Sequence, residues 1–296
     1  MLSPADLVDL HTHSQASDGA DTPETLVRSA AEDGIRALAL TDHDCIDGLE
    51  QFLMACHKYA VAGIPGVEVS VKFMEFRMHI VGLGLRRTSG YDHLMELLEQ
   101  ARIWRDERNQ AIVDRFCSLK VPMTIDEVNA EAGGEVIARP HFARVLMKKG
   151  IVRSIPEAFE RFLRKGGTAY VPKRKLDAKM VVDALRSAQC IVILAHPVSM
   201  LEGTSVSLEE ALQLSKELGV DGFEAFHPDV QQGTRRRIIR YAQTNSMLVS
   251  GGSDYHGGNK PLSFLGRASG NRPIWARDVW PLLQKLSDSG WLSLES

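Results

Sequence analysis

Short motifs that combine histidines with carboxylates recur along this chain. The first is DLHTH at residues 9–13. Residues two apart in an extended strand point to the same side, so the imidazoles of His11 and His13 are expected to face one site. Imidazole is a common ligand for Zn, Mn and Fe. One such pair is weak evidence by itself, but it suits a divalent metal ion.

Similar groups follow along the chain. TDHD at 41–44 comes after an apolar run, and Asp18, in a glycine-containing loop, is placed to share an ion with His43. Glu68 is assigned to the end of the third predicted strand, where its two oxygens can each coordinate one metal and so bridge a pair. Together these groups predict a metal site, and the candidate ligands are His11, His13, Asp18, His43, Glu68, His79, His196, Asp254 and His256.

Two motifs late in the chain also contribute candidate ligands, and one further histidine, His227, is not counted among the ligands. His196 lies in LAHP, where the following proline favours an extended backbone at the histidine. SDYH at 253–256 places a carboxylate and an imidazole two residues apart. His227, in FHP at 226–228, is not needed as a ligand, which leaves it free for another role at the same site.

Alternating apolar runs and amphipathic segments indicate the elements that must position these residues. We expect strands at 8–11, 37–41, 66–72, 78–85, 191–194, 222–225 and 247–250, and helices at 23–33, 48–61, 178–188, 207–218 and 234–244. The third and fourth strands are expected to pair through the short turn around residue 75. Strand–helix alternation predicts a mostly parallel sheet. The candidate ligands fall at strand ends, where (β/α) barrels build their active sites, so a barrel is favoured over an open sheet.

The stretch 90–167 breaks this alternation. It contains helix-length segments at 94–119, 124–131, 141–149 and 155–163, and we interpret it as a helical insertion that caps the active site. Residues 86–175 carry 18 Lys and Arg against 12 Asp and Glu, a net +6 in a chain of net −3. This basic segment indicates an anionic ligand, although a solvated helical surface would have the same charge. The predicted domains are a metal-binding barrel at 1–89 and 168–296, and the insertion at 90–167.

The composition is ordinary for a soluble globular protein. The chain has 296 residues, of which 44% are hydrophobic and 25% charged. Apolar runs such as 191–195 are too short to cross a bilayer, and no apolar run precedes the first histidines, so neither a membrane segment nor a signal peptide is expected. The cysteines (Cys45, Cys56, Cys117 and Cys190) form no CxxC pair. This pattern argues against a zinc ribbon or a disulfide framework and predicts a cytoplasmic protein, with no protein partner evident.

The motifs HxH, TDHD, a strand Glu, AHP and SDxH, in this order, resemble the PHP (polymerase and histidinol phosphatase) family, whose members adopt a distorted (β/α)7 barrel. The resemblance covers most of the chain outside the insertion. It implies a trinuclear centre with His11, His13, Glu68 and Asp254 on one ion, Glu68, His79 and His196 on a second, and Asp18, His43 and His256 on a third. Many relatives carry histidine where Asp18 stands, and an aspartate favours Mn over Zn. Three Mn²⁺ ions are therefore expected, with Fe²⁺ or Zn²⁺ as alternatives.

With its inserted segment, the chain looks closest to the subgroup of this family that acts on nucleotides. That resemblance implies hydrolysis of the 3′-phosphate of nucleoside 3′,5′-bisphosphates, and trimming of short RNA from the 5′ end. A hydroxide bridging two ions held by Glu68 would attack phosphorus in line. His43 and His227 are the catalytic candidates, and His227 is the one expected to bind the phosphate or to protonate the leaving group.

Substrate choice is expected to come from the insertion. Arg102 and Arg105 are three apart in a predicted helix, so they share a face that can grip a second phosphate. The other candidates for substrate contact are Glu135, Arg139 and His141, together with His227. The main alternative is a phosphatase of another small ester such as histidinol phosphate, and metal-dependent amide hydrolysis also stays open. A processive nuclease is disfavoured because long nucleic acid usually demands a broad basic track. A scaffold with a vestigial site would have lost ligands, whereas every motif position here is filled.

Overall fold

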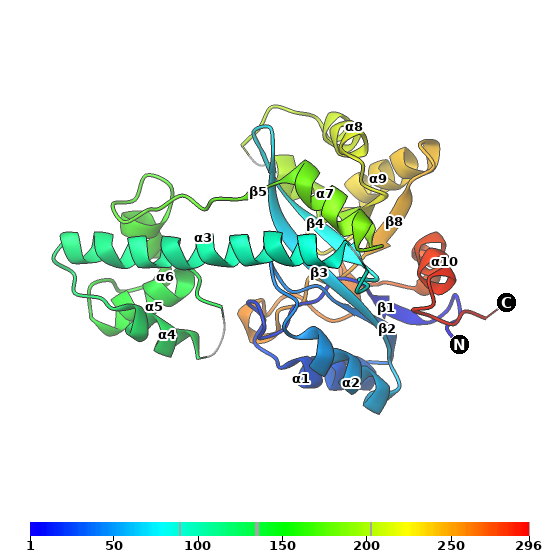
Figure 1. The fold of residues 1–296 in the computed structure, drawn as a ribbon, viewed down its shortest axis with the longest axis horizontal. Coiled ribbons are helices and arrows are strands. Elements are labelled where there is room, and N and C mark those ends of the chain that lie inside the picture. The colour runs from blue at the N-terminus through cyan, green and yellow to red at the C-terminus, as the bar shows by residue number, and fades with distance from the viewer. Residues whose placement is uncertain (89, 134–135, 202, 296) are drawn as a thin grey trace. The chain divides into compact units, whose positions relative to one another are not determined.

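The computed structural model describes residues 1–88, 90–133, 136–201 and 203–295 (Figure 1). The chain forms two compact units, of which the first comprises Met1–Leu98 and Leu176–Ser296 and the second Glu99–Lys175. The second unit overlaps the predicted insertion, 90–167, over most of its length. Its role as a cap over an active site stays a prediction.

A sheet of eight strands forms the centre of the first unit. Its strands are β1 (Leu7–Asp9), β2 (Ile35–Leu40), β3 (Ala62–Phe73), β4 (Phe76–Leu83), β5 (Leu176–Asp177), β6 (Ile191–Leu194), β7 (Gly222–Phe226) and β8 (Leu248–Gly251). Their order is β1-β2-β3-β4-β6-β7-β8, with β5 paired to β3. Neighbours are parallel except around β4, which runs antiparallel to both β3 and β6. The predicted hairpin between the third and fourth strands is therefore confirmed.

Helices connect the parallel strands of this unit. They are α1 (Pro23–Glu32), α2 (Leu49–Tyr59), α7 (Ala178–Ser187), α8 (Leu208–Leu218), α9 (Gln232–Thr244) and α10 (Trp280–Asp288). Local sequence sets their ends: Thr22 caps α1 by accepting a hydrogen bond from the Thr25 amide, and Ser207 and Glu210 form a capping box at α8. Leu26 and Phe52 bury the apolar faces of α1 and α2 in one core cluster. The predicted helices are confirmed, and α10 is an addition that the sequence pattern did not predict.

Shorter elements complete the first unit. They are the strands β9 (Arg267–Ala268) and β10 (Arg272–Pro273), which pair with each other, and the 3₁₀ helices Pro197–Leu201, Gly257–Asn259 and Ala276–Asp278. In Figure 1 the helices α1 and α2 lie together on one side of the strands, and α7, α8 and α9 lie on the other.

A mixed α/β fold is thus established, but closure of the sheet into a (β/α)7 barrel stays a prediction. The described sheet is an open path from β1 to β8. Backbone hydrogen bonds beyond its ends join the two outer strands: the Leu10 amide donates to Gly251 O at 3.1 Å, and the Asp254 amide to His11 O at 2.9 Å. The segments that follow β1 and β8 therefore lie side by side, and both carry candidate ligands.

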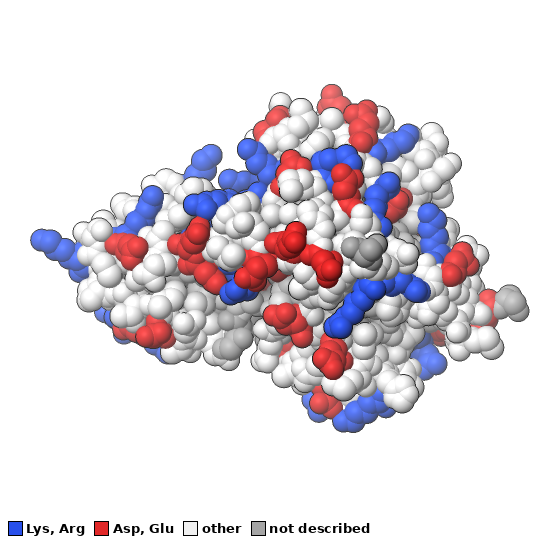
Figure 2. Space-filling view, viewed as in Figure 1, with Lys and Arg blue, Asp and Glu red and all other residues white. Residues whose placement is uncertain are grey.

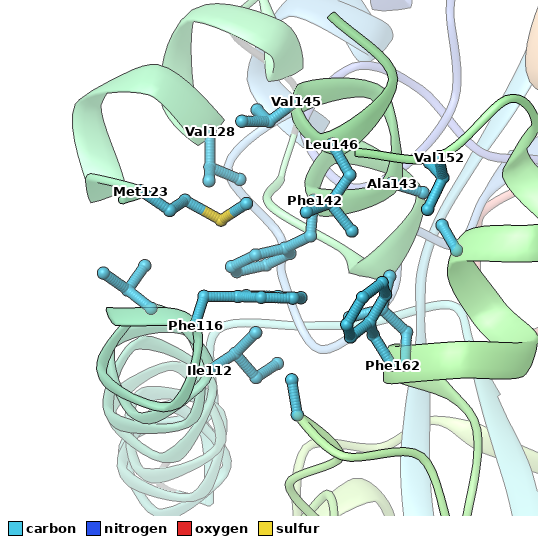
Figure 3. Packing of buried hydrophobic residues seen from close by; sticks show 14 residues of the cluster. Ile112, Phe116, Met123, Val128, Phe142, Ala143, Val145, Leu146, Val152 and Phe162 are labelled. Carbon is cyan, nitrogen blue, oxygen red and sulfur yellow. The ribbon is translucent and has the colours of Figure 1, made fainter. Parts of the chain in front are cut away.

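The second unit has a hydrophobic core of its own. It contains most of α3 (Tyr91–Ser118), then α4 (Ile125–Ala132), α5 (Arg139–Lys148), α6 (Ile155–Ala158) and a π-helical turn at Phe159–Leu163. Figure 3 shows the core, in which Phe116, Phe142 and Phe162 meet between the helices. The rings of Phe116 and Phe162 have their centroids 5.5 Å apart. The helical content predicted for this segment is confirmed. In the part of the chain that is described, no helix combines the length and the apolarity that a membrane span would need.

Candidate metal centre

Glu68 lies at the centre of the cluster that the sequence predicted. Its assignment to the end of a strand is wrong, because β3 continues to Phe73, where it turns into the hairpin with β4. β3 pairs with β2 on one edge, over residues 62–65, and with β4 on the other, over residues 66–73, where Glu68 lies opposite Val81. Its side chain is 0% exposed. A carboxylate so deeply buried requires positively charged partners.

One oxygen of Glu68 faces the HxH pair. Glu68 Oε2 lies 3.1 Å from His11 Nε2, 3.3 Å from His13 Nε2 and 3.0 Å from His43 Nδ1. Asp254 reaches the same place, with Oδ1 3.2 Å from His13 Nε2. Ligand atoms of His11, His13, Glu68 and Asp254 all lie within 4.8 Å of one another. The two imidazoles of the HxH motif therefore face one site, as their spacing predicted.

The other oxygen of Glu68 faces a second pair of imidazoles. Glu68 Oε1 lies 2.9 Å from His79 Nδ1, on β4, and 2.9 Å from His196 Nε2, just after β6. His43, Glu68 and His79 also form a group whose ligand atoms could hold an ion. Each oxygen of Glu68 is thus directed at a different set of imidazoles, which is the arrangement that a bridging carboxylate needs.

A third group lies at the more exposed side of the cluster. Asp18 Oδ1 is 3.2 Å from His256 Nε2, and Asp18 Oδ2 is 4.0 Å from His43 Nε2. His13 joins these three residues within the same 4.8 Å limit. The structure therefore brings all nine candidate ligands into one region of the first unit. Their assignment to particular ions stays a prediction.

Unsatisfied buried atoms test whether this cluster fits a metal. Five buried ligand atoms make no hydrogen bond with any of the described residues: His11 Nε2, both ring nitrogens of His13, His43 Nδ1 and Glu68 Oε2. A buried polar atom left without a partner costs about 1 to 3 kcal/mol, so several at one point indicate a missing ligand. Imidazole nitrogens and carboxylate oxygens together suit Zn, Mn or Fe. The residues thus fit divalent ions, whose identity and number stay predictions.

The electrostatics of the cluster point the same way. Burial alone would raise the pKa of Glu68, but the imidazoles of His43, His11 and His79 outweigh it and hold the pKa well below its usual value. Burial would lower the pKa of His13, yet the nearby carboxylates of Asp254 and Glu68 raise it to about 10. The carboxylates therefore stay ionised, and they attract positive charge, which a metal ion supplies.

Glu224, on β7, holds two of the candidate ligands in place. The sequence motifs did not identify it. Its Oε1 lies 3.0 Å from His11 Nδ1, and its Oε2 accepts a hydrogen bond of 2.8 Å from the His196 amide. A carboxylate on one ring nitrogen fixes the tautomer and leaves the other nitrogen free for a metal. A glutamate in the middle of the apolar strand GFEAF is the signal that would have found it.

Two buried aspartates hold the loops that carry the ligands. Asp9 accepts hydrogen bonds from the Ser253 amide, the Ser253 hydroxyl and the Gly266 amide. Burial outweighs these bonds and raises the pKa of Asp9 to about 6. Asp42 accepts in the same way from Ser14 and Ser17. Both aspartates belong to motifs already recognised, but their role is to fix the backbone around the ligands.

Left-handed backbone occurs at two of the candidate ligands. His196 has φ +27° and Asp254 has φ +50°. The extended backbone that Pro197 led us to expect at His196 is therefore wrong. Such conformations cost about 1 to 3 kcal/mol each and persist where the surroundings impose them. At His196 the hydrogen bond from its amide to Glu224 supplies that constraint.

His227 contacts the candidate ligand Asp254. The Asp229 amide donates to His227 Nδ1 at 3.1 Å, so the ring proton is on Nε2, which lies 3.3 Å from Asp254 Oδ2. Lys260 Nζ reaches the same oxygen at 2.5 Å. His227 is fully buried, and its contacts favour the positioning of Asp254. The sequence prediction that it binds phosphate or protonates the leaving group stays a prediction.

Apart from His227, the described candidates for substrate contact lie in the second unit, and Arg102, Arg139 and His141 have partners there. Arg102 bonds Glu99 through two nitrogens, at 2.7 and 2.6 Å, and Asp106 at 3.2 Å. Arg105 lies one turn further along α3.

Two more of these candidates stand at the start of α5. Arg139 donates to Leu163 O and stacks over Phe159, and the buried His141 accepts from the Ala138 amide. Glu135 lies outside the described residues. These contacts stabilise the unit itself, and contact with substrate stays a prediction for all of these residues.

Some basic residues of the inserted segment form ion pairs with its acidic residues. Arg161 pairs with Glu157 at 2.6 Å, and Lys149 pairs with Glu127 at 2.6 Å. Figure 2 shows Lys and Arg interspersed with Asp and Glu over the face in view. On this face the excess of basic residues does not gather into one continuous tract.

A cluster of buried histidines and carboxylates in a mixed α/β fold is typical of metal-dependent hydrolases. The comparisons with known proteins identify the family. Residues 9–137 match the model of the PHP domain. The chain is 33% identical over 248 residues to a 5′-3′ exoribonuclease of Haemophilus influenzae, which covers 84% of this chain and 89% of the relative. This protein belongs to the PHP family and is a metal-dependent phosphoesterase.

Two further relatives extend the match over nearly the whole chain. A 3′,5′-nucleoside bisphosphate phosphatase of Chromobacterium violaceum is 29% identical over 278 residues, covering 94% of this chain and 96% of the relative. A Bifidobacterium adolescentis protein, whose crystal structure is described as that of a metal-dependent phosphoesterase, superimposes with a TM-score of 0.79 at 27% identity. That match covers 96% of each chain. The resemblance inferred from the motifs is thereby confirmed.

Proposed function

We propose that this protein hydrolyses the 3′-phosphate of nucleoside 3′,5′-bisphosphates, for example adenosine 3′,5′-bisphosphate to AMP and phosphate. The observation that carries the proposal is the cluster around Glu68, with its orphaned ligand atoms, in a chain of the PHP family. The Chromobacterium violaceum relative, aligned over 94% of this chain, bears the name of this activity.

The nine candidate ligands would hold the divalent ions. When bound, such ions lower the pKa of a coordinated water and neutralise charge on phosphate oxygens. Phosphoryl transfer needs mainly positioning and electrostatic stabilisation, and a rigid set of ligands provides both. Here Glu224 fixes the ring of His11, and Asp9 fixes the backbone at Ser253, beside Asp254.

Exposure indicates the side from which a phosphate would arrive. The side chains of Asp18, His43 and His79 are 39%, 23% and 26% exposed. His11, His13 and Glu68 are buried at the back. His43 therefore borders the open side, where it can move a proton to or from a bound ester as well as serve as a ligand.

A substrate panel tests the proposal. We would measure phosphate release by the manganese-loaded protein from adenosine 3′,5′-bisphosphate, 5′-AMP, 3′-AMP and histidinol phosphate. Rapid release from the bisphosphate with slow turnover of both monophosphates is expected. Rapid turnover of histidinol phosphate alone would contradict the proposed substrate and leave the phosphoesterase chemistry intact.

Trimming of short RNA from the 5′ end is a second candidate activity. The specific observation that favours it is the 33% identity to the Haemophilus influenzae exoribonuclease over 84% of this chain. A 5′-phosphorylated RNA of four or five nucleotides, added to the same panel, tests it. Release of 5′-mononucleotides is expected, and an intact oligonucleotide would exclude this activity.

A further inference from the structure

Hydrogen bonds fix the loop after His256 to the segments that carry the candidate ligands. The hydroxyl of Ser263 donates to the carbonyl oxygens of Ser253 and Asp254, and the Ser263 side chain is buried. Gly266 donates its amide to Asp9 at 2.7 Å, and Leu265 is buried in the core of α1 and α2. The loop is thus held at two points to the segments that carry candidate ligands.

Large apolar side chains nevertheless point from this loop into solvent. Leu262 is 87% exposed and Phe264 is 56% exposed. Every other Phe or Trp among the described residues is buried or partly buried. A single exposed apolar residue needs no explanation, but two on a firmly anchored loop beside a catalytic centre indicate a contact surface.

The same loop brings a cation to the metal centre. Lys260 Nζ lies 2.5 Å from Asp254 Oδ2, whereas Asp254 Oδ1 faces the imidazoles of His13 and His256 at 3.2 and 3.5 Å. The ammonium carries three N–H groups, and its hydrogen bond within the described residues goes to Asp254. Since 37% of the Lys260 side chain is exposed, its other N–H groups are accessible to an anion.

We propose that residues 260–264 recognise the substrate within the first unit: Lys260 donates to a phosphate oxygen, and Phe264, flanked by Leu262, stacks against the nucleobase. This inference rests on the proposed function. A nucleotide is the ligand that fits, because it joins an anionic phosphate to a flat apolar ring over the span of one sugar. Stacking of a base on an aromatic side chain is also tolerant of base identity.

Phe264→Ala tests the stacking contact. The kcat/KM would be compared for adenosine 3′,5′-bisphosphate and for its abasic analogue, the same ribose bisphosphate without adenine. Stacking on an aromatic ring typically changes affinity by about tenfold, so the variant should lose about tenfold more kcat/KM on the nucleotide than on the analogue. Met74→Ala, at the exposed turn between β3 and β4, is the matched control. Equal losses on both substrates would overturn the base contact.

Lys260→Met tests the phosphate contact, with Lys285→Met on α10 as the control. We expect a fall in kcat/KM of at least about tenfold on both substrates, since a charge-assisted hydrogen bond to the phosphate is lost. Calorimetric affinity for AMP should fall in parallel. The bound metal per chain, measured by elemental analysis, should not fall, because the change removes a positive charge beside Asp254. A loss of metal instead would assign Lys260 a structural role and overturn the proposal.

These tests separate the two proposals. Wild-type protein that hydrolyses neither bisphosphate would contradict the proposed function. Wild-type protein that hydrolyses both, with Phe264→Ala and Lys260→Met behaving like their controls, would contradict only the recognition loop.

Discussion

Phe116, Phe142 and Phe162 fill the centre of the second unit with apolar side chains. The first unit instead buries Glu68, on β3, among imidazoles. The apolar core is complete without a ligand because its contacts satisfy one another. Five buried ligand atoms of the polar cluster make no hydrogen bond with the described residues, so the cluster is incomplete without a bound ion. The residues at the centre of the second unit therefore stabilise its fold, whereas the cluster around Glu68 in the first unit is arranged to bind a ligand.

The largest effect on stability is expected from removing a large side chain from the apolar core of the second unit. Phe142→Ala should lower the free energy of unfolding of the second unit by about 3 to 5 kcal/mol, since it removes a fully buried ring and leaves a cavity. Urea denaturation would measure this, with Met147→Ala, exposed on the same helix, as the control. Metal affinity should be retained, because the metal ligands belong to the first unit. A parallel loss of metal would show that metal binding depends on the core of the second unit.

Glu68→Gln should lower metal affinity, the property that Phe142→Ala is expected to leave unchanged. The substitution keeps the shape of the side chain but removes the charge that faces five imidazoles. Metal affinity should fall by more than about a hundredfold, beyond the range for residues that only orient a ligand. Isothermal titration with Mn²⁺ would measure it. Addition of a chelator should lower the melting temperature of the wild type and affect the variant much less.

The control for this variant is Glu75→Gln, in the exposed turn of the same hairpin. It makes the same chemical change on the same pair of strands but away from the imidazoles. An equal loss of metal affinity in both variants would show that the charge of Glu68 is not what holds the ions.

Glu224→Gln should weaken the site less. A neutral amide holds the His11 ring less firmly and no longer increases its basicity, so metal affinity should fall by about 10- to 100-fold. Glu209→Gln, an exposed glutamate paired with Arg237, is the matched control. Titration with Mn²⁺ would again be the measurement, and an affinity equal to that of the control would remove Glu224 from the site.

Ser207→Ala should have the smallest effect. It removes the side-chain cap of α8 and should cost about 1 kcal/mol in the free energy of unfolding. Ser205→Ala, at an exposed position before the helix, serves as the control. Metal affinity should not change, because the cap lies outside the cluster. A loss of affinity would mean that general destabilisation of the first unit, rather than specific contacts, decides metal binding.

Much of the fold followed from local patterns. The helix starts at Pro23 and Leu208 were predictable because capping residues and apolar periodicity act over a few residues. The HxH spacing predicted that His11 and His13 share a direction, which depends only on the pleat of a strand.

Other features depend on contacts between distant segments, which no local pattern encodes. Glu224 contributes through its partner on another strand, and the left-handed backbone of His196 depends on that same glutamate. Lys260 stands only a few residues from a motif, but its contact with Asp254 depends on how the intervening loop is tied down. The expected strand 66–72 already extends past Glu68, and the observed start of β3 at Ala62 places this residue still further inside the strand.

The hairpin between β3 and β4 also limits how this protein can change over generations. Glu68 pairs with Val81 and Ser70 with His79, so Glu68 and His79 project from the same face of the sheet. A slip of one residue in this register would turn one of the two side chains to the opposite face. Insertions and deletions between Glu68 and His79 that shift the pairing should therefore be removed by selection, whereas substitutions at the exposed Glu75 should be tolerated. The identity of residues at the tip of the hairpin can vary, but the number of residues between Glu68 and His79 cannot.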